Sequence, residues 1–143
     1  MQIISQPGEM STMSELLETS KKNRPVRRIL LVDDEEMVRN TTKEILNYLG
    51  YEVTVACGGE EAIQLYKDKK DQFDLLIIDL IMPKMNGVVC FEHIKKLDPT
   101  VPVVISSGIS EIGKKESILQ MGVSAFIQKP FTIDVLQSTL HSI

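Results

Sequence analysis

Five polar side chains of this sequence stand at or just beyond the ends of short apolar runs. They are Asp33, Asp34, Asp79, Ser107 and Lys129. Short apolar runs without polar alternation are typical of strands that are buried in a parallel sheet. Parallel strands end at a common edge, and ligands bind at that edge in open α/β sheets. We therefore predict that three carboxylates, one hydroxyl and one ammonium group meet in a single site.

Asp79 stands at the centre of this predicted row. The apolar run 75–78 precedes it, and Pro83 and Asn86-Gly87 mark a loop soon after it. Taken alone, Asp79 could simply cap its strand or the next helix. The other polar strand ends favour a functional role for it instead.

The residue types of this site favour phosphoryl transfer. Three neighbouring carboxylates need a counter-charge, and carboxylates with a backbone carbonyl and waters suit Mg²⁺. Lys129 can bind a phosphate as a point charge, and the Ser107 hydroxyl can donate a hydrogen bond to the same group. No cysteine or histidine is placed to act as a nucleophile. We therefore predict an aspartyl phosphate, with Asp79 as the acceptor.

The elements that must position these residues alternate between strand and helix. Strands are expected at residues 29–32, 51–57, 74–79, 102–105 and 124–127, with helices ending near 49, 68, 97, 121 and 142. Such alternation implies a doubly wound α/β fold, a five-stranded parallel sheet in the flavodoxin-like order 2-1-3-4-5. Met37 and Ile133 are expected to face the core, and 111–121 is expected to form one weak helix around Gly113.

The overall composition limits the possible partners and location. The 143 residues carry a formal net charge of -4, which argues against direct nucleic-acid binding. No apolar run approaches the roughly 20 residues of a membrane span, so we expect a cytoplasmic protein without membrane contact. Cys57 and Cys90 lack metal-ligand spacing and are expected to be buried free thiols. Residues 1–27 are predicted to form a flexible tail or linker, and residues 28–143 a single domain.

Several motifs together resemble the receiver domains of two-component response regulators, over about residues 28–143. They are Asp33-Asp34, Asp79 with Met82-Pro83 and Asn86-Gly87, Ser107-Gly108, Phe126 and Lys129-Pro130-Phe131. The resemblance implies Mg²⁺-dependent phosphorylation of Asp79 by the phosphohistidine of a sensor histidine kinase or a histidine phosphotransfer domain. It also implies that a downstream protein binds the face formed by the fourth helix, the fifth strand and the fifth helix.

The resemblance further assigns individual roles. Asp34 would bind the metal directly and Asp33 mainly through water, while Asp79 and the backbone carbonyl of Ile81 would complete the protein ligands. Lys129 would pair with the phosphoryl group. The Lys129–Pro130 peptide bond would be cis. Ser107 and Phe126 would form the switch pair, with Phe126 at a position that tyrosine often holds.

A metal-dependent phosphohydrolase with an Asp nucleophile would need an acid two residues after Asp79, where Ile81 stands. A phosphate-independent scaffold would be expected to have lost parts of the site, which is intact. We therefore expect a phosphoacceptor without turnover of an external substrate. The residues around Ser107 and Lys129 look most like those of receivers in hybrid sensor kinases, and the sequence leaves a stand-alone regulator open as the alternative.

Overall fold

A computed structural model describes residues 25–143, except for the side chains of Lys70, Ile109 and Ile112. The predicted tail, residues 1–27, lies outside the described residues as far as position 24, and its flexibility therefore stays a prediction.

Five parallel strands form one sheet in the order β2-β1-β3-β4-β5. The strands are β1 (Arg28–Val32), β2 (Glu52–Ala56), β3 (Leu75–Asp79), β4 (Val103–Ser107) and β5 (Ala125–Gln128). The order confirms the predicted doubly wound fold. It places β1 and β3 side by side, and β4 between β3 and β5.

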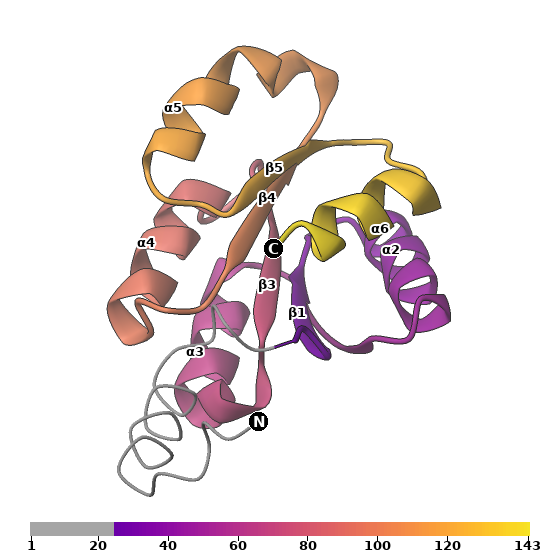
Figure 1. Ribbon diagram of the computed structural model, residues 1–143. Helices are drawn as coiled ribbons and strands as arrows, with labels where there is room; N and C mark the ends of the chain where they lie inside the picture. Colours follow the sequence, from indigo (N-terminus) through magenta and orange to yellow (C-terminus); the bar gives the residue numbers. More distant parts are fainter. Residues whose placement is uncertain (1–24) are drawn as a thin grey trace, which may run out of the picture.

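Helices cover both faces of the sheet (Figure 1). They are α2 (Glu36–Tyr48), α3 (Gly59–Lys69), α4 (Gly87–Leu97), α5 (Lys115–Gln120) and α6 (Ile133–His141), with 3₁₀ turns η2 (Lys70–Gln72) and η3 (Ile109–Lys114). Helices α3, α4 and α5 lie on one face, and α2 and α6 lie on the other. No helix among these described residues is long and apolar enough to cross a membrane.

The two faces divide the core because side chains alternate along each strand. Leu76 and Ile78 of β3 pack with α3, α4 and α5, whereas Leu75 and Ile77 pack with α2 and α6. All five residues of β3 are buried, which explains its continuous apolar run. Asp79, the last residue of β3, is therefore carried to the carboxyl edge of the sheet with both faces covered.

The loop after β3 is fastened to the strand by its last residues. The Asn86 side chain caps α4 by accepting a hydrogen bond from the Val89 backbone N–H at 3.0 Å. The N–H of Gly87 donates to the Leu80 carbonyl at 2.8 Å. A Cβ at Gly87 would lie 2.5 Å from the carbonyl oxygen of Asp79, so only glycine permits this close packing.

Three side-chain predictions were wrong. Met37 is 82% exposed and Ile133 is 41% exposed. Each lies in the first turn of its helix, close to the carboxyl edge at which the preceding strand ends. Cys90 is buried as expected, but Cys57 is exposed because it directly follows the edge strand β2.

The segment predicted as one helix over residues 111–121 is divided. It begins in the 3₁₀ turn η3 and continues as the short helix α5. Gly113, inside η3, disfavours regular helix because glycine loses more backbone entropy on ordering than other residues.

Candidate functional site

Three carboxylates converge at the carboxyl edge of the sheet. One oxygen each of Asp33, Asp34 and Asp79 lies within 4.8 Å of the other two. Asp33 and Asp34 follow β1, and Asp79 ends the adjacent β3. Asp33 and Asp79 are buried, with 3% and 4% of their surface exposed, and Asp34 is half-buried. The strand order therefore produces the acidic cluster that the sequence predicts.

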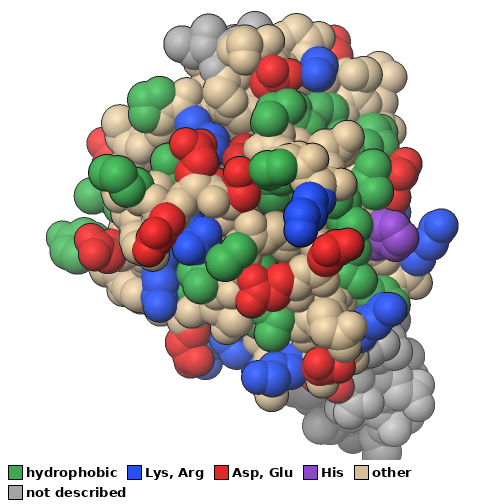
Figure 2. Space-filling view, turned by 180° about the vertical axis from the view of Figure 1, so that it is seen from behind, with side chains coloured by type: hydrophobic (Ala, Val, Ile, Leu, Met, Phe, Trp, Pro, Cys, Tyr) green, Lys and Arg blue, Asp and Glu red, His purple; other side chains and the backbone are tan. Residues whose placement is uncertain are grey.

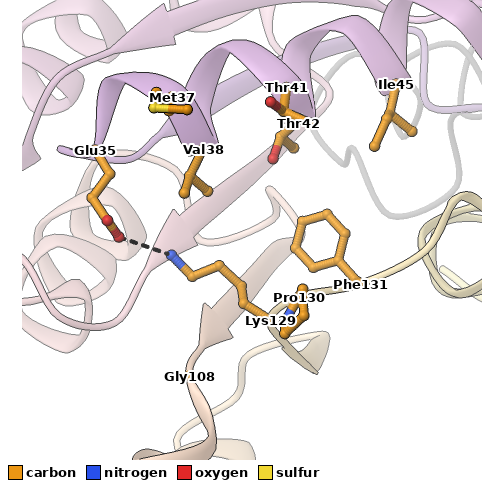
Figure 3. A pocket seen from close by; sticks show the side chains of 10 residues that line it. All are labelled: Glu35, Met37, Val38, Thr41, Thr42, Ile45, Gly108, Lys129, Pro130 and Phe131. Carbon is orange, nitrogen blue, oxygen red and sulfur yellow. Dashed lines mark ion pairs between the residues drawn. The ribbon is translucent and has the colours of Figure 1, made fainter.

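Lys129, directly after β5, extends into this cluster. Its Nζ lies 3.3 Å from Oδ2 of Asp33 and 3.3 Å from Oδ1 of Asp79. Glu35 contributes a weaker contact, since its Oε1 lies 3.9 Å from the same Nζ (Figure 3). The backbone N–H of Lys129 donates to the Ser107 carbonyl at 2.6 Å, and the Lys129–Pro130 bond is cis, as predicted.

The charges of the site are unbalanced. The pKa of Asp79 is raised to about 6: burial raises it most, Lys129 lowers it in part, and Asp33 and Asp34 also raise it. For Lys129, burial lowers the pKa, but Asp79 and Asp33 outweigh this and hold it above its usual value. One lysine therefore faces three neighbouring carboxylates. Asp79 loses its proton at a higher pH in the folded chain than an ordinary aspartic acid does.

The opposite end of β3 shows how a balanced carboxylate behaves. Asp74 accepts the backbone N–H groups of Arg27 and Arg28 at 3.1 and 3.0 Å, and the Arg28 guanidinium at 3.3 Å. Burial raises the pKa of Asp74, but these bonds outweigh burial and bring it below the usual value. The protein thus stabilises the charged form of Asp74, whereas the contact with Lys129 does not offset the burial of Asp79.

The acidic cluster fits a hard divalent cation such as Mg²⁺, because it offers converging oxygen ligands and excess negative charge. Asp33 already uses both carboxylate oxygens: Oδ1 accepts the Glu35 N–H at 2.9 Å, and Oδ2 pairs with Lys129. The Asp34 carboxylate has no hydrogen-bonding partner within the described part of the chain. Asp34 is thus freer for direct coordination than Asp33.

Ser107 and Phe126 occupy a different part of the edge. Ser107 is fully buried, and its hydroxyl donates to the Gly108 carbonyl at 3.3 Å. Phe126 pairs with Ile105 across β4 and β5 and packs on the core beneath α5. The structure therefore brings Asp33, Asp79 and Lys129 into contact, while the Ser107 hydroxyl is engaged locally. Ile81 lies in the loop after β3 with an exposed side chain.

A groove adjoins the acidic cluster, and neither it nor the Glu35 contact was predicted from the sequence. Its volume is about 520 Å³. One wall comes from α2, and the other from the segment after β5 (Figure 3). The lining is mostly apolar: Met37, Val38, Ile45, Pro130 and Phe131 form most of it, with Glu35 and Lys129 at one end. The four acidic residues 33–36 indicate the start of a helix. They do not show which of these carboxylates contacts Lys129.

Residues 29–141 match the model of the response regulator receiver domain family. The chain belongs to this family, whose members are the phosphoacceptors of two-component signalling. The "Chemotaxis protein CheY" of Thermotoga maritima is 35% identical over 106 residues, covering 73% of this chain and 87% of that protein. The "Probable transcriptional regulator ycf27" of Cyanidium caldarium is 32% identical over 124 residues, covering 87% of this chain. The chain spans 49% of that regulator, about half its length.

Solved structures share the fold. A response regulator receiver domain protein from Clostridium thermocellum superimposes with a TM-score of 0.77 at 26% identity, covering 82% of this chain and 93% of that one. A chain from the CheX–CheY–BeF₃–Mg²⁺ complex of Borrelia burgdorferi also gives 0.77 at 26% identity, covering 85% and 96%. The receiver fold predicted from the sequence is therefore confirmed.

Proposed function

We propose that Asp79 accepts a phosphoryl group from the phosphohistidine of a sensor histidine kinase or a histidine phosphotransfer domain, in a Mg²⁺-dependent reaction. The observation that carries this proposal is the environment of Asp79. Its buried carboxylate, with a pKa of about 6, lies beside two further carboxylates and 3.3 Å from Lys129. A bound cation would stabilise the ionised form of this carboxyl group, and in that form it is a nucleophile.

Each residue of the site has a defined part in the reaction. Bound Mg²⁺ would neutralise charge on the transferring phosphoryl oxygens. Asp34, Asp79 and the Ile81 carbonyl would hold the cation, and Asp33 would act mainly through water. An Asp79 oxygen attacks phosphorus, the phosphorus–nitrogen bond to the donor histidine breaks, and its electron pair returns to the imidazole. Lys129 then pairs with the phosphoryl oxygens.

The groove beside α2 is a suitable docking place for the donor protein. Lys129 and Glu35 belong both to the groove and to the edge of the acidic cluster, so a partner seated there would reach Asp79. The exposed Met37 on its rim adds apolar surface that a helix of the donor could cover. The acidic cluster beside this end of the groove favours a donor with basic residues near its histidine.

Phosphorylation would change the face formed by α5, β5 and α6. The backbone of Lys129 is bonded to Ser107, so movement of Lys129 toward a phosphoryl group acts directly on the end of β4. Ser107 would turn toward the phosphate, and Phe126 would move into the space it leaves. This is a bias between two existing conformations, which an output protein would distinguish.

The output partner is proposed to be a protein rather than a nucleic acid. Figure 2 shows acidic and basic side chains interspersed over one face of the molecule. The formal net charge of -4 agrees with this arrangement. A nucleic-acid partner would instead favour a cluster of Lys and Arg.

The chemistry can be tested with acetyl phosphate and Mg²⁺. We expect about one hydroxylamine-labile phosphate per chain and no sustained turnover, because the aspartyl phosphate is the product. Continued release of inorganic phosphate from an unrelated phosphate ester would instead support an Asp-nucleophile phosphohydrolase. If the chain showed no labelling and no turnover, that result would support a phosphate-independent scaffold.

The conformational part is tested by amide hydrogen exchange with and without beryllofluoride and Mg²⁺. We expect altered protection in η3, α5, β5 and α6, because these elements follow Ser107 and flank Phe126. Equal protection of these elements in both samples would contradict the proposed output face.

A further inference from the structure

Every polar atom of Asp33 has a partner. Its N–H donates to the Ala56 carbonyl at 3.2 Å, and its Oδ1 accepts the Glu35 N–H at 2.9 Å. Its Oδ2 pairs with Lys129. Its backbone carbonyl accepts a hydrogen bond from Nη1 of Arg39 at 2.9 Å. This last bond involves a charged side chain that has no part in the chemistry described above.

The Arg39 side chain carries an energetic cost that a purely structural role does not explain. Its Nε is buried and has no hydrogen-bonding partner among the described residues. A buried donor without a partner destabilises the folded chain, so stability alone would not favour a guanidinium at this position. Its one described side-chain bond, to Asp33, is therefore the feature that explains its presence.

That bond holds the peptide group between Asp33 and Asp34. Because a peptide group is planar, fixing its carbonyl oxygen also fixes the direction in which the chain enters Asp34. The Asp34 carboxylate has no hydrogen bond of its own in the described part of the chain. The direction of its side chain therefore depends on the backbone that Arg39 holds.

We propose that Arg39 is a positioning residue of the metal site: its bond to the Asp33 carbonyl directs the Asp34 carboxylate toward the cation. The inference rests on the proposed Mg²⁺ site and extends it to a residue outside the acidic cluster. Groups that orient metal ligands without touching the metal commonly change metal affinity by about 10- to 100-fold when they are removed.

Loss of the Arg39 charge and loss of its bond to Asp33 would change the Mg²⁺ affinity in opposite directions. A guanidinium near the acidic cluster repels Mg²⁺, so loss of its charge alone would strengthen Mg²⁺ binding. Loss of the bond to Asp33 would weaken Mg²⁺ binding, because Asp34 would no longer be directed toward the cation. The sign of the change in affinity therefore separates the two roles.

The test is isothermal titration of the unphosphorylated full chain with Mg²⁺, comparing the parent with Arg39→Met and Lys43→Met. Lys43 lies one turn further along α2, and its side chain has no ion pair or hydrogen bond with any other described residue. We expect Arg39→Met to weaken Mg²⁺ binding by about tenfold or more. Lys43→Met, which removes the same charge, should stay within about twofold of the parent, because distant surface charges are screened by salt.

Thermal melts in EDTA verify that each variant is folded. If Arg39→Met does not fold, Arg39→Gln replaces it, with the same expected loss. Unchanged or tighter Mg²⁺ binding by the folded Arg39 variant, while the parent binds Mg²⁺, would overturn this inference and leave the proposed function standing. A parent that does not bind Mg²⁺ would overturn both. Arg39→Lys, which keeps a donor and the charge, should retain more affinity than Arg39→Met.

Discussion

Nζ of Lys129 lies 3.3 Å from Oδ1 of Asp79, although the strands that carry these residues are separated by β4. The lysine reaches past the end of β4 and is shared with Asp33. One ammonium group thus serves several carboxylates, and it does not balance them. Burial, with a smaller effect from Asp33 and Asp34, keeps the pKa of Asp79 raised although Lys129 lowers it. The excess negative charge accounts for the affinity for a cation that we propose.

Asp79→Asn should stabilise the protein at neutral pH in the absence of Mg²⁺. The folded-state pKa of Asp79, about 6, exceeds the ordinary 3.8, so the folded chain keeps a proton that the unfolded chain has lost. The contribution of Asp79 to the free energy of unfolding therefore falls as the pH rises from about 4 to about 6, and stays low above that. A difference of this size corresponds to at most about 3 kcal/mol.

Urea unfolding at about pH 4 and about pH 7.5 measures this effect, because Asp79 titrates between these values. The variant should match the parent closely at the acidic pH and exceed its stability at the higher pH. Asp74→Asn is the matched control at the other end of β3. Since its pKa is lowered in the folded chain, removing that carboxylate should destabilise the protein at neutral pH. An advantage of Asp79→Asn that grows toward acidic pH would contradict the account.

Lys129→Met should raise the pKa of Asp79 above its value of about 6, because Lys129 is the group that lowers it. Mg²⁺ binding should persist, since all three carboxylates remain. Carbon NMR of the Asp79 carboxyl group follows the titration directly, and Lys115→Met, an exposed lysine at the start of α5, serves as control. A pKa of Asp79 that is unchanged or lowered in Lys129→Met would show that the ion pair has no role in the electrostatics of the site.

Gly87→Ala should destabilise the fold by about 2 kcal/mol or more, because the new methyl group would overlap backbone atoms that cannot move aside. Its Cβ would lie 2.5 Å from the Asp79 carbonyl oxygen and 2.9 Å from the Leu80 Cα. Gly58→Ala is the control, since a Cβ there meets nothing within 4 Å. Chemical denaturation compares the two variants. Equal stabilities would show that α4 can shift away from β3 without cost.

The sequence was sufficient for the fold and for the acidic cluster, because both follow from strand ends. Five apolar runs alternating with helices define the parallel sheet, and each polar residue after a run must reach its carboxyl edge. The same reasoning placed Asp79 at the carboxyl edge, but it could not predict how the pKa of Asp74 or of Asp79 would change. Burial raises the pKa of both residues. The bonds from Arg28 and Arg27 outweigh burial at Asp74, whereas Lys129 does not outweigh it at Asp79.

The contacts made by the first turn of α2 could not be predicted from the sequence. Periodicity predicted that Met37 faces the core, but this side chain in the first turn of α2 is exposed. The same turn sends Glu35 to Lys129 and Arg39 to the Asp33 carbonyl. Which side chains turn back depends on the residue at which the helix begins, and a run of four acids leaves that residue undetermined.

The most direct test of the central claim identifies the phosphorylated atom. The protein is incubated with acetyl phosphate and Mg²⁺, reduced with borohydride, which converts an aspartyl phosphate to homoserine, and digested for mass spectrometry. We expect homoserine at position 79 and none in the Asp79→Asn variant, because Asp79 is the buried nucleophile beside Lys129. Homoserine at position 33 or 34, or undiminished phosphate in Asp79→Asn, would contradict it.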